Sequence, residues 1–319
     1  MRVPFRPLIK WPGGKAREWS EIAAYVPHGI RHFVDPFVGG GAPFGLTPFK
    51  GEAFLNDRHE RLIALYRCVQ SGDADFVREL DALSQDWDSL GRIAQTTAAA
   101  FAAAVERARQ RSAADPRDLH DHLTAALRRS PLRRSSAAGR TALAYLEHAL
   151  GDKARRVANL ERKHDVTFDA AAAAEHGETA VRAGYYTLVR AHERTASLPA
   201  GVADFVFVRD YCYGSMFRAS KDGGFNIPYG GTSYNNKRFA TRVERLVDPR
   251  ARQSLERTQL SCGDFEPFLD ELAPRLSADD FVFVDPPYHS DFSTYGEHPF
   301  DLADHARLGI FDEVLVRPI

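Results

Sequence analysis

The sequence predicts an α/β fold built on a parallel sheet, and three short apolar segments carry that prediction. Phe281–Val284 is apolar and mostly β-favouring, and it stops at Asp285-Pro286-Pro287 because neither proline can donate to a sheet ladder. His32–Val34 and Ala53–Leu55 also read as short strands, and an acidic residue follows each within two positions. In open α/β sheets the ligand crevice lies at the carboxyl ends of the strands, so we expect the functional site there.

Composition narrows the class of protein. The chain has 319 residues, of which 44% are hydrophobic and 27% charged, as in a globular protein with two or more units. Its net charge of −1 gives no global attraction to nucleic acid, so any basic surface must be local. Three widely spaced cysteines without a CxxC pair predict a reducing compartment and no metal site. Without a signal core or a long apolar stretch, we expect a cytoplasmic protein that does not contact membranes.

Residues 285–288, Asp-Pro-Pro-Tyr, suit a planar ring that bears an amine. Asp285 and the Pro286 carbonyl can accept the two amine hydrogens, Pro287 keeps Pro286 extended, and Tyr288 can stack on the ring. An exocyclic amine on a nucleobase is a poor nucleophile, and drawing both hydrogens to one side favours a pyramidal nitrogen. The alternative from these residues alone is a strand followed by a tight Pro-Pro turn.

A second motif, Asp35-Pro36-Phe37-Val38 followed by Gly39, Gly40 and Gly41, reads as a strand entering a glycine turn that opens a helix. Such a turn lets the backbone approach a ligand and offers free N–H groups. Asp57 lies 18 positions after Gly39, a spacing that suits an acceptor for ribose hydroxyls. The dinucleotide fingerprint fails at Phe44. The motif is therefore a nucleoside half-site or a plain glycine turn.

An early loop and a late loop carry further candidates. Trp11-Pro-Gly-Gly-Lys15 places an indole and an ammonium on a tight turn, where Trp11 either faces a ligand or anchors the loop on the core. Residues 221–231 form a loop rich in glycine and aromatic residues, which is either a DNA-facing loop or a structural lid. Residues near it have the types that contact phosphates and base edges, namely Arg218, Lys221, Tyr229, Asn235, Asn236, Lys237 and Arg238.

The region between these motifs is helical in character. Residues 86–181 are rich in alanine and arginine, with leucines at helical spacing. Within them, residues 127–136 look like an exposed basic linker that either touches DNA phosphates or remains a solvated loop. Residues 205–208 are apolar, and the pattern fits a helix or a strand equally well.

Taken in order, the motifs resemble those of the Dam-like (D12 class) N6-adenine-specific DNA methyltransferases. The segments that carry the resemblance are Lys10–Lys15, Asp35–Gly41, Asn56-Asp57, Phe217-Arg218 with Phe225–Gly230, Cys262–Phe265 and Asp285–Tyr288. They cover roughly residues 5–85 and 185–310 and follow the family's order.

The resemblance implies a Rossmann-like sheet that uses S-adenosylmethionine as methyl donor and an adenine flipped out of double-stranded DNA as acceptor. Trp11, Lys15, Asp35 and the Phe37–Gly41 turn, including Gly39 and Gly41, would line the donor pocket. Asp57 would hold the ribose hydroxyls, Asp264 the cofactor's adenine amine, and Asp285 would border both ligands. Asp285, Pro286, Pro287 and Tyr288 would form the catalytic motif, and residues 185–240 the DNA contacts. Extruding the base costs a few kcal/mol.

The expected organisation is a discontinuous catalytic domain (1–85 and 252–319), a helical insert (86–184) and a target-recognition region (185–251). Two features depart from the family: the long insert, and a chain that stops where further C-terminal strands are expected. We therefore expect either a truncated form or a protein partner or second chain that completes the sheet, since an open sheet edge is a liability.

Three functions are compatible with this sequence. The first is a site-specific adenine N6-methyltransferase, for which the family resemblance implies a restriction–modification or defence setting. The second is a methyltransferase-like DNA-binding protein that has no turnover alone. The third is methylation of another planar amine, such as an RNA base or a glutamine side chain.

Overall fold

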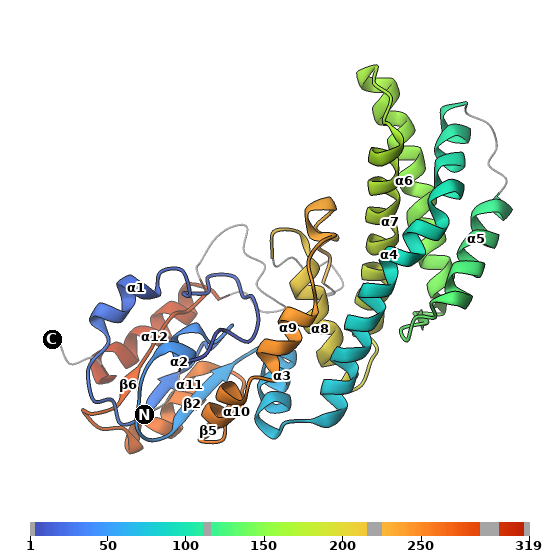
Figure 1. Ribbon diagram of the computed structural model, residues 1–319. Coiled ribbons are helices and arrows are strands. Elements are labelled where there is room, and N and C mark those ends of the chain that lie inside the picture. Colours follow the sequence, from blue (N-terminus) through green and yellow to red (C-terminus); the bar gives the residue numbers. More distant parts are fainter. Residues whose placement is uncertain (1–3, 111–115, 216–224, 288–299, 316–319) are drawn as a thin grey trace. The chain divides into compact units, whose positions relative to one another are not determined.

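A computed structural model describes residues 4–110, 116–215, 225–287 and 300–315 (Figure 1). Three of the sequence-predicted site residues, Arg218, Lys221 and Tyr288, lie outside this described part.

The chain divides into two compact units. The first, here the sheet unit, contains Met1–Val77, Ser215–Ile227 and Arg242–Ile319. The second, here the helical unit, contains Arg78–Gly214 and Pro228–Thr241. The residues expected to form the insert therefore share one unit with much of the expected target-recognition region. The three-part division itself stays a prediction.

The sheet unit is built on four parallel strands in the order β5-β2-β1-β6. These strands are β1 (Phe33–Asp35), β2 (Ala53–Asp57), β5 (Thr258–Cys262) and β6 (Phe281–Val282). The mixed α/β architecture with a parallel sheet confirms that part of the sequence prediction. Parallel neighbours need crossover connections, which explains why β5 and β6 come from the far end of the chain but pair with β2 and β1.

β6 differs from the buried strand that its apolar run predicts. Strand pairing covers only Phe281 and Val282, and both side chains are partly exposed. Val284, expected inside the sheet, is 38% exposed. The reason is position: β6 is an edge strand that pairs with β1 on one side, and in the described residues no strand lies on its other side.

Alternate side chains of the strands pack on opposite faces of the sheet. Val34 and Phe54 lie on the face covered by α11 (Phe265–Leu272) and α12 (Leu302–Leu315), in a core cluster with Phe265, Leu269 and Leu308. Phe33 packs on the other face against Phe44 of α2 (Ala42–Leu46). α3 (Glu60–Ser71) contacts β2 and β5, and α10 (Pro249–Leu255) contacts α3. A short helix, α1 (Trp19–Ile22), precedes β1.

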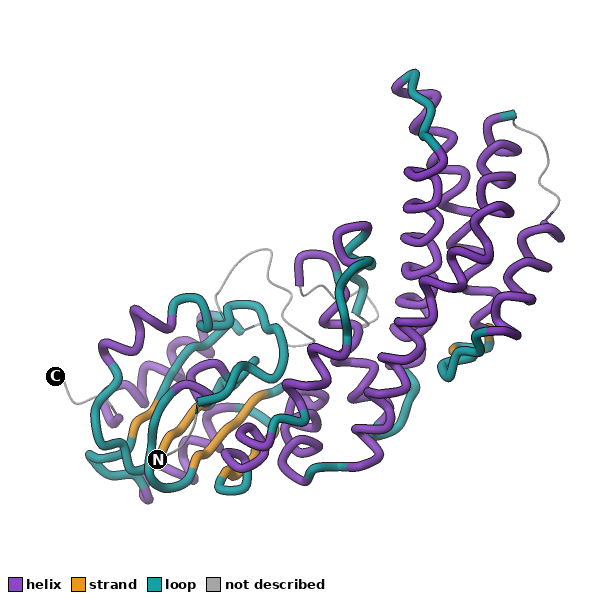
Figure 2. Tube along the Cα trace, in the orientation of Figure 1, coloured by secondary structure: helices purple, strands orange, loops and turns teal. Residues whose placement is uncertain are grey.

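Long helices make up most of the helical unit, as the purple tube in Figure 2 shows. They are α4 (Ala74–Arg109), which begins in the sheet unit, α5 (Pro116–Arg129), α6 (Ala142–His164), α7 (Ala170–Glu193) and α8 (Ala200–Tyr211). A small hairpin, β3 (Ser136–Ala137) with β4 (Arg140–Thr141), separates α5 from α6, and α9 (Ala240–Leu246) leads back to the sheet unit. Residues 205–208, ambiguous in the sequence, are helical and buried in α8.

The basic run at 127–136 is only partly the exposed linker that the sequence suggests. Arg134 is buried, with its guanidinium 2.9 Å from Asp204 and 2.6 Å from Glu79. Asp86 of α4 accepts hydrogen bonds from the backbone N–H groups of Arg133 and Arg134. These contacts hold the segment against α4 and α8. Burial of the Arg134 guanidinium is possible because Asp204 and Glu79 supply the compensating carboxylates.

Candidate active site

Four aspartates follow the four strands of the sheet. Asp35 ends β1, Asp57 ends β2, Asp264 follows β5 by two residues, and Asp285 follows β6. Because the strands are parallel, their carboxyl ends meet at one edge of the sheet, and the four carboxylates gather there. The sequence motifs that carry acids, far apart in the chain, thus form one site.

Lys15 and Asp285 form an ion pair within this site. Lys15 Nζ lies 2.8 Å from Asp285 Oδ2, and both side chains are largely buried. Lys15 also donates to the Gly13 carbonyl at 2.9 Å, which holds the ammonium over its own loop. The pKa of Asp285 is raised, chiefly by burial, and the hydrogen bond and charge of Lys15 offset part of that rise. The early loop therefore supplies the cation that favours the ionised form of the carboxylate in the Asp-Pro-Pro-Tyr motif.

Asp57 and Asp35 are held by backbone N–H groups. Asp57 accepts from Gly39 at 3.0 Å through Oδ2 and from His59 at 2.9 Å through Oδ1. Burial raises its pKa to about 6, against the opposing effect of these two bonds. Asp35 accepts from Phe37 at 3.0 Å, and burial raises its pKa well above the usual range, with Asp285 and Asp57 adding to the rise.

Asp264 is bound by two arginines. Its Oδ1 accepts from Arg307 at 3.0 Å and from the Glu266 N–H at 3.0 Å. Its Oδ2 accepts from Arg58 at 2.5 Å and from Arg307 at 3.1 Å. Burial alone would raise the pKa of Asp264, but these hydrogen bonds and the charges of both arginines lower it. A carboxylate offers about four acceptor positions, so all of them are in use.

The side chains of Trp11 and Tyr66 pack closely against the glycine turn that follows β1. Gly39 and Gly41 have positive φ angles of 48° and 73°. A Cβ on Gly39 would lie 2.7 Å from the Trp11 ring, and one on Gly41 would overlap the Tyr66 hydroxyl. Tyr66 also donates to the Gly39 carbonyl at 3.0 Å. The turn therefore requires glycine both for its conformation and for the close packing of Trp11 and Tyr66. Trp11 packs as a loop anchor, and its role toward a ligand stays a prediction.

Phe37 packs against the ring of Phe265, with 5.3 Å between the ring centroids, and against that of Phe300. Pro286 and Pro287 are partly exposed beyond β6. The contact between Phe37 and Phe265 brings the turn after β1 next to the turn after β5, which carries Asp264.

The DNA-binding candidates described by the structure lie in the helical unit and differ in exposure. Tyr229 and Asn235 are buried, and the Tyr229 hydroxyl donates to Asn235 at 3.0 Å. Lys237 lies 2.7 Å from Asp210. Asn236 and Arg238 are exposed. Tyr229, Asn235 and Lys237 thus have internal bonding partners, while Asn236 and Arg238 present their side chains to solvent.

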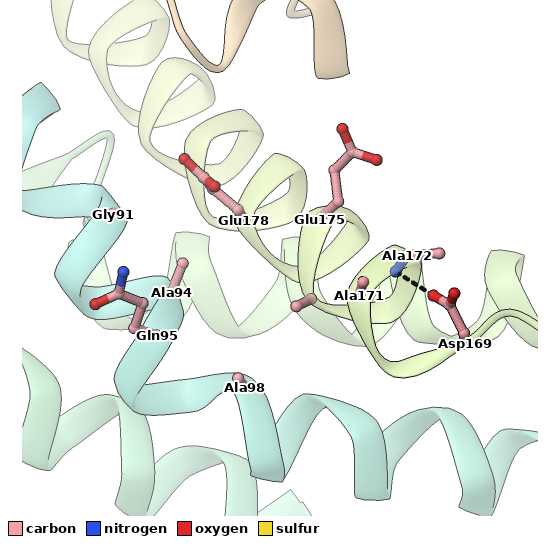
Figure 3. Close-up of a pocket in the computed structure, with 10 residues that line it drawn as sticks. Gly91, Ala94, Gln95, Ala98, Asp169, Ala171, Ala172, Glu175 and Glu178 are labelled. Atoms are coloured by element: carbon pink, nitrogen blue, oxygen red, sulfur yellow. Dashed lines mark hydrogen bonds between the residues drawn. The ribbon is translucent and has the colours of Figure 1, made fainter.

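The helical unit also has a hollow of about 770 Å³ between α4 and α7 (Figure 3). Small residues such as Ala94 and Ala98 line it together with Asp169, Glu175 and Glu178. Glu178 pairs with Arg182 at 2.7 Å, and Asp169 accepts from the Ala172 N–H as the N-cap of α7. The carboxylates of this hollow repel phosphate, so it does not suit a DNA backbone.

Comparison with known proteins settles the family. A model of the D12 class N6 adenine-specific DNA methyltransferase family matches residues 11–116 and 153–316, most of the chain. The chain belongs to this family. It is an adenine-specific DNA methyltransferase, and members of its family take the methyl group from S-adenosylmethionine. The internal unmatched stretch, 117–152, lies within the region expected as an insert and contains α5 except its first residue, the β3–β4 hairpin and the first part of α6.

Individual relatives agree with this family. The methyltransferase is 24% identical over 323 residues to the type II methyltransferase M.MjaIII of Methanocaldococcus jannaschii, covering 96% of this chain and 78% of the relative. It is 22% identical over 311 residues to the type II methyltransferase M.CviBI of Paramecium bursaria Chlorella virus NC1A, with the same coverage. A shorter match, 33% identical over 104 residues, is to the retron Ec67 DNA adenine methylase of Escherichia coli and covers 33% of each chain.

The sequence did not indicate several residues of the candidate site. Arg58 and Arg307 bind Asp264, and Tyr66 supports the glycine turn. Arg58 adjoins Asp57 and could have drawn attention, but nothing in the sequence links Arg307 to Asp264. Within the described ranges, no cluster of His, Cys, Asp and Glu side chains is placed to hold a metal ion. None of the described helices combines the length and apolarity needed to cross a bilayer.

Proposed function

We propose that this methyltransferase transfers a methyl group from S-adenosylmethionine to N6 of an adenine flipped out of double-stranded DNA at a specific sequence. The observation that carries the proposal is the carboxyl edge of the sheet, where Asp35, Asp57, Asp264 and Asp285 converge. This arrangement supports a site in which Asp57 and Asp264 would hold the nucleoside and Asp285 would hold the target amine.

The residues at this edge fit S-adenosylmethionine. Each oxygen of Asp57 accepts one backbone N–H bond and retains a further lone pair for a ribose hydroxyl. Phe37 offers an aromatic face beside the turn of Asp264. The Lys15 ammonium, which pairs with Asp285, also suits the carboxylate of the cofactor. Asp264 would hold the cofactor's adenine amine after releasing one arginine bond. Bound there, the cofactor would supply an electrophilic methyl group.

The target adenine would be gripped by Asp285 and the Pro286 carbonyl, with Tyr288 stacking on the ring. Asp285 must be ionised to accept an amine hydrogen, and the Lys15 ammonium at 2.8 Å favours that form. Accepting the hydrogens of N6 orients its lone pair toward the methyl donor and gives the leaving proton a nearby oxygen. The site lies at a sheet edge, so a base stacked in a duplex has to be extruded to reach it.

DNA recognition is assigned to the region around residues 218–238. Asn236 and Arg238 are the exposed candidates for phosphate or base contacts, with Arg218 and Lys221 completing the set. Tyr229, Asn235 and Lys237 would support the recognition surface through their internal bonds. The type II methyltransferase relatives favour a restriction–modification setting.

A protein partner or second chain is part of the proposal. The outer edge of β6 pairs with no strand of the described residues, and Val284 is 38% exposed there. A strand added at this edge would cover Val284 and extend the sheet.

The test is methyl transfer from labelled S-adenosylmethionine to unmethylated DNA, comparing the wild type with Asp285→Asn and Asp280→Asn. Asp280 precedes β6 and pairs with Arg31 at 2.8 Å, away from the carboxyl edge. We expect label on adenine N6 that is lost in Asp285→Asn and kept, per folded molecule, in Asp280→Asn.

Cofactor binding without label would favour the second candidate, a methyltransferase-like DNA-binding protein that needs a partner for turnover. Label on an RNA base or a protein would redirect the assignment of substrate. Absence of cofactor binding would overturn the proposal.

A further inference from the structure

The end of β2 joins the two turns that flank it. The side-chain amide of Asn56 donates through Nδ2 to the Pro36 carbonyl at 3.1 Å, in the turn after β1. The same nitrogen donates to the Gly263 carbonyl at 3.0 Å, in the turn after β5. One NH₂ group therefore links two turns that are more than two hundred residues apart in the sequence.

The orientation of this amide follows from its partners. Carbonyl oxygens only accept, so Nδ2 must face both of them, and a flipped amide would bring three oxygens together. Asn56 is 1% exposed, and its Oδ1 is buried without a hydrogen-bond partner among the described residues. An unsatisfied buried oxygen is unfavourable, so a side chain kept only for packing would be better served by an apolar residue of similar shape.

Backbone bonds alone do not provide the same link. The Val38 N–H donates to the Asn56 carbonyl at 2.9 Å, and the Gly263 N–H donates to the Asp57 carbonyl at 3.2 Å. Any residue at position 56 would allow these bonds. The Asn56 side chain adds the cross-link between the residues directly before Phe37 and Asp264, the two groups assigned to the cofactor's nucleoside.

We propose that Asn56 is a positioning residue that fixes the distance between the turns of Phe37 and Asp264 and thereby sets the affinity for the nucleoside part of S-adenosylmethionine. This inference rests on the proposed function, which assigns those turns to the cofactor. Asn56 itself touches neither the methyl group nor the target base in this scheme.

Gln70 of α3 offers a matched control. Its Nε2 donates to the Leu255 and Thr258 carbonyls, both at 2.8 Å, and so bridges two carbonyls at the opposite end of β5. Replacing either amide with an apolar residue of similar shape, Asn56→Leu or Gln70→Met, removes two hydrogen bonds from a side-chain amide to backbone carbonyls. Only the substitution of Asn56 should change the affinity for the cofactor.

The experiment measures binding of S-adenosylmethionine and of adenosine by calorimetry, with thermal unfolding of each variant as a reference. We expect Asn56→Leu to raise Kd for both ligands at least tenfold and to raise KM for S-adenosylmethionine. The value of kcat at saturation should change less than threefold. Gln70→Met should lower Tm comparably and leave both affinities within twofold of the wild type. If Asn56→Leu does not fold, Asn56→Asp carries the test, since it keeps the shape and lacks the NH₂ donors.

Three outcomes would overturn the inference. If a folded Asn56 variant binds with wild-type affinity, Asn56 has no positioning role, and the proposed function is unaffected. Equal weakening by Gln70→Met would mean that general loss of stability, and not the position of the two turns, controls affinity. Failure of the wild type itself to bind S-adenosylmethionine would remove both the proposed function and this inference.

Discussion

Asp264 illustrates how fully one side chain can be occupied before a ligand arrives. Arg307 contributes two of its four bonds and also pairs with Glu266 and Asp304. Arg58 contributes one bond, and its side chain is 41% exposed. Since an exposed ion pair is weak, Arg58 is the partner that a cofactor amine can displace.

We therefore expect Arg58→Gln to tighten binding of S-adenosylmethionine. Loss of a competitor worth about 0.2–1 kcal/mol corresponds to roughly a 1.5- to 5-fold lower Kd. Arg250→Gln, which breaks the exposed Arg250–Asp248 pair elsewhere in the sheet unit, is the control and should leave Kd unchanged. Isothermal titration measures both, and weaker binding in Arg58→Gln would show that Arg58 supports the pocket instead.

Asp57 gives the site a pH dependence. Its pKa of about 6 in the free protein lies above the ordinary value, so its ionisation costs stability as pH rises from about 4 to about 6. A ligand that donates ribose hydroxyls and carries a positive sulfonium favours the carboxylate and lowers that pKa. Affinity should therefore rise with pH up to about 6 and then level off.

We expect about a tenfold gain in affinity for S-adenosylmethionine between pH 5 and 7, measured by titration in buffers of equal ionic strength. Asp57→Asn should bind more weakly and with a much flatter pH profile. A wild-type profile without a step near pH 6 would contradict the assignment of Asp57 as the acceptor.

At the scale of elements, α4 holds the helical unit together through Asp86. This buried carboxylate accepts from the Arg133 and Arg134 N–H groups and from the Tyr185 hydroxyl of α7 at 2.7 Å. It thereby joins α4, the segment before the β3–β4 hairpin, and α7. A buried acceptor with three donors is costly to remove, because each donor is left without a partner.

We expect Asp86→Ala to lower the free energy of unfolding by roughly 3–5 kcal/mol, while Asp88→Ala, exposed on the same helix, changes it by less than about 0.5 kcal/mol. Urea denaturation followed by circular dichroism measures both variants. Similar values for the two aspartates would show that the network around Asp86 contributes little.

For the whole molecule, the division into two units predicts where a cofactor acts. All of the described cofactor candidates, from Trp11 to Asp285, belong to the sheet unit, whereas the described DNA-binding candidates from Tyr229 to Arg238 belong to the helical unit. Cofactor binding and DNA contact are thus assigned to different compact units of one chain.

We expect S-adenosylmethionine to slow hydrogen exchange in the turns after β1, β2, β5 and β6 and to leave α5, α6 and α7 unchanged. At a ligand concentration of 100 times Kd, the stabilisation is about 2.7 kcal/mol. Methionine alone is the control ligand and should give little protection. Protection spread equally over the long helices would contradict the assignment of the cofactor to the sheet unit.

The sequence by itself determined the parallel α/β sheet and the family. Strand ends are local features: an apolar run that stops at an acid followed by proline marks them at Asp35 and Asp285, and the apolar run 53–55 ends at Asn56-Asp57. Parallel topology then brings those ends to one edge. Ordered motifs spread over the chain were enough to indicate a D12 class methyltransferase, and the family match confirmed it.

Only the tertiary structure decided which side chains act on one another. Lys15 with Asp285, Arg307 with Asp264 and Asn56 with two separate turns are contacts between distant segments, and no local pattern encodes them. Packing also decided burial. Arg134, Tyr229 and Asn235 look like surface residues in the sequence but are buried, because carboxylate or amide partners compensate each polar group inside the fold. The sheet edge at β6 is exposed for the complementary reason: an apolar run is buried only where a neighbouring element covers it.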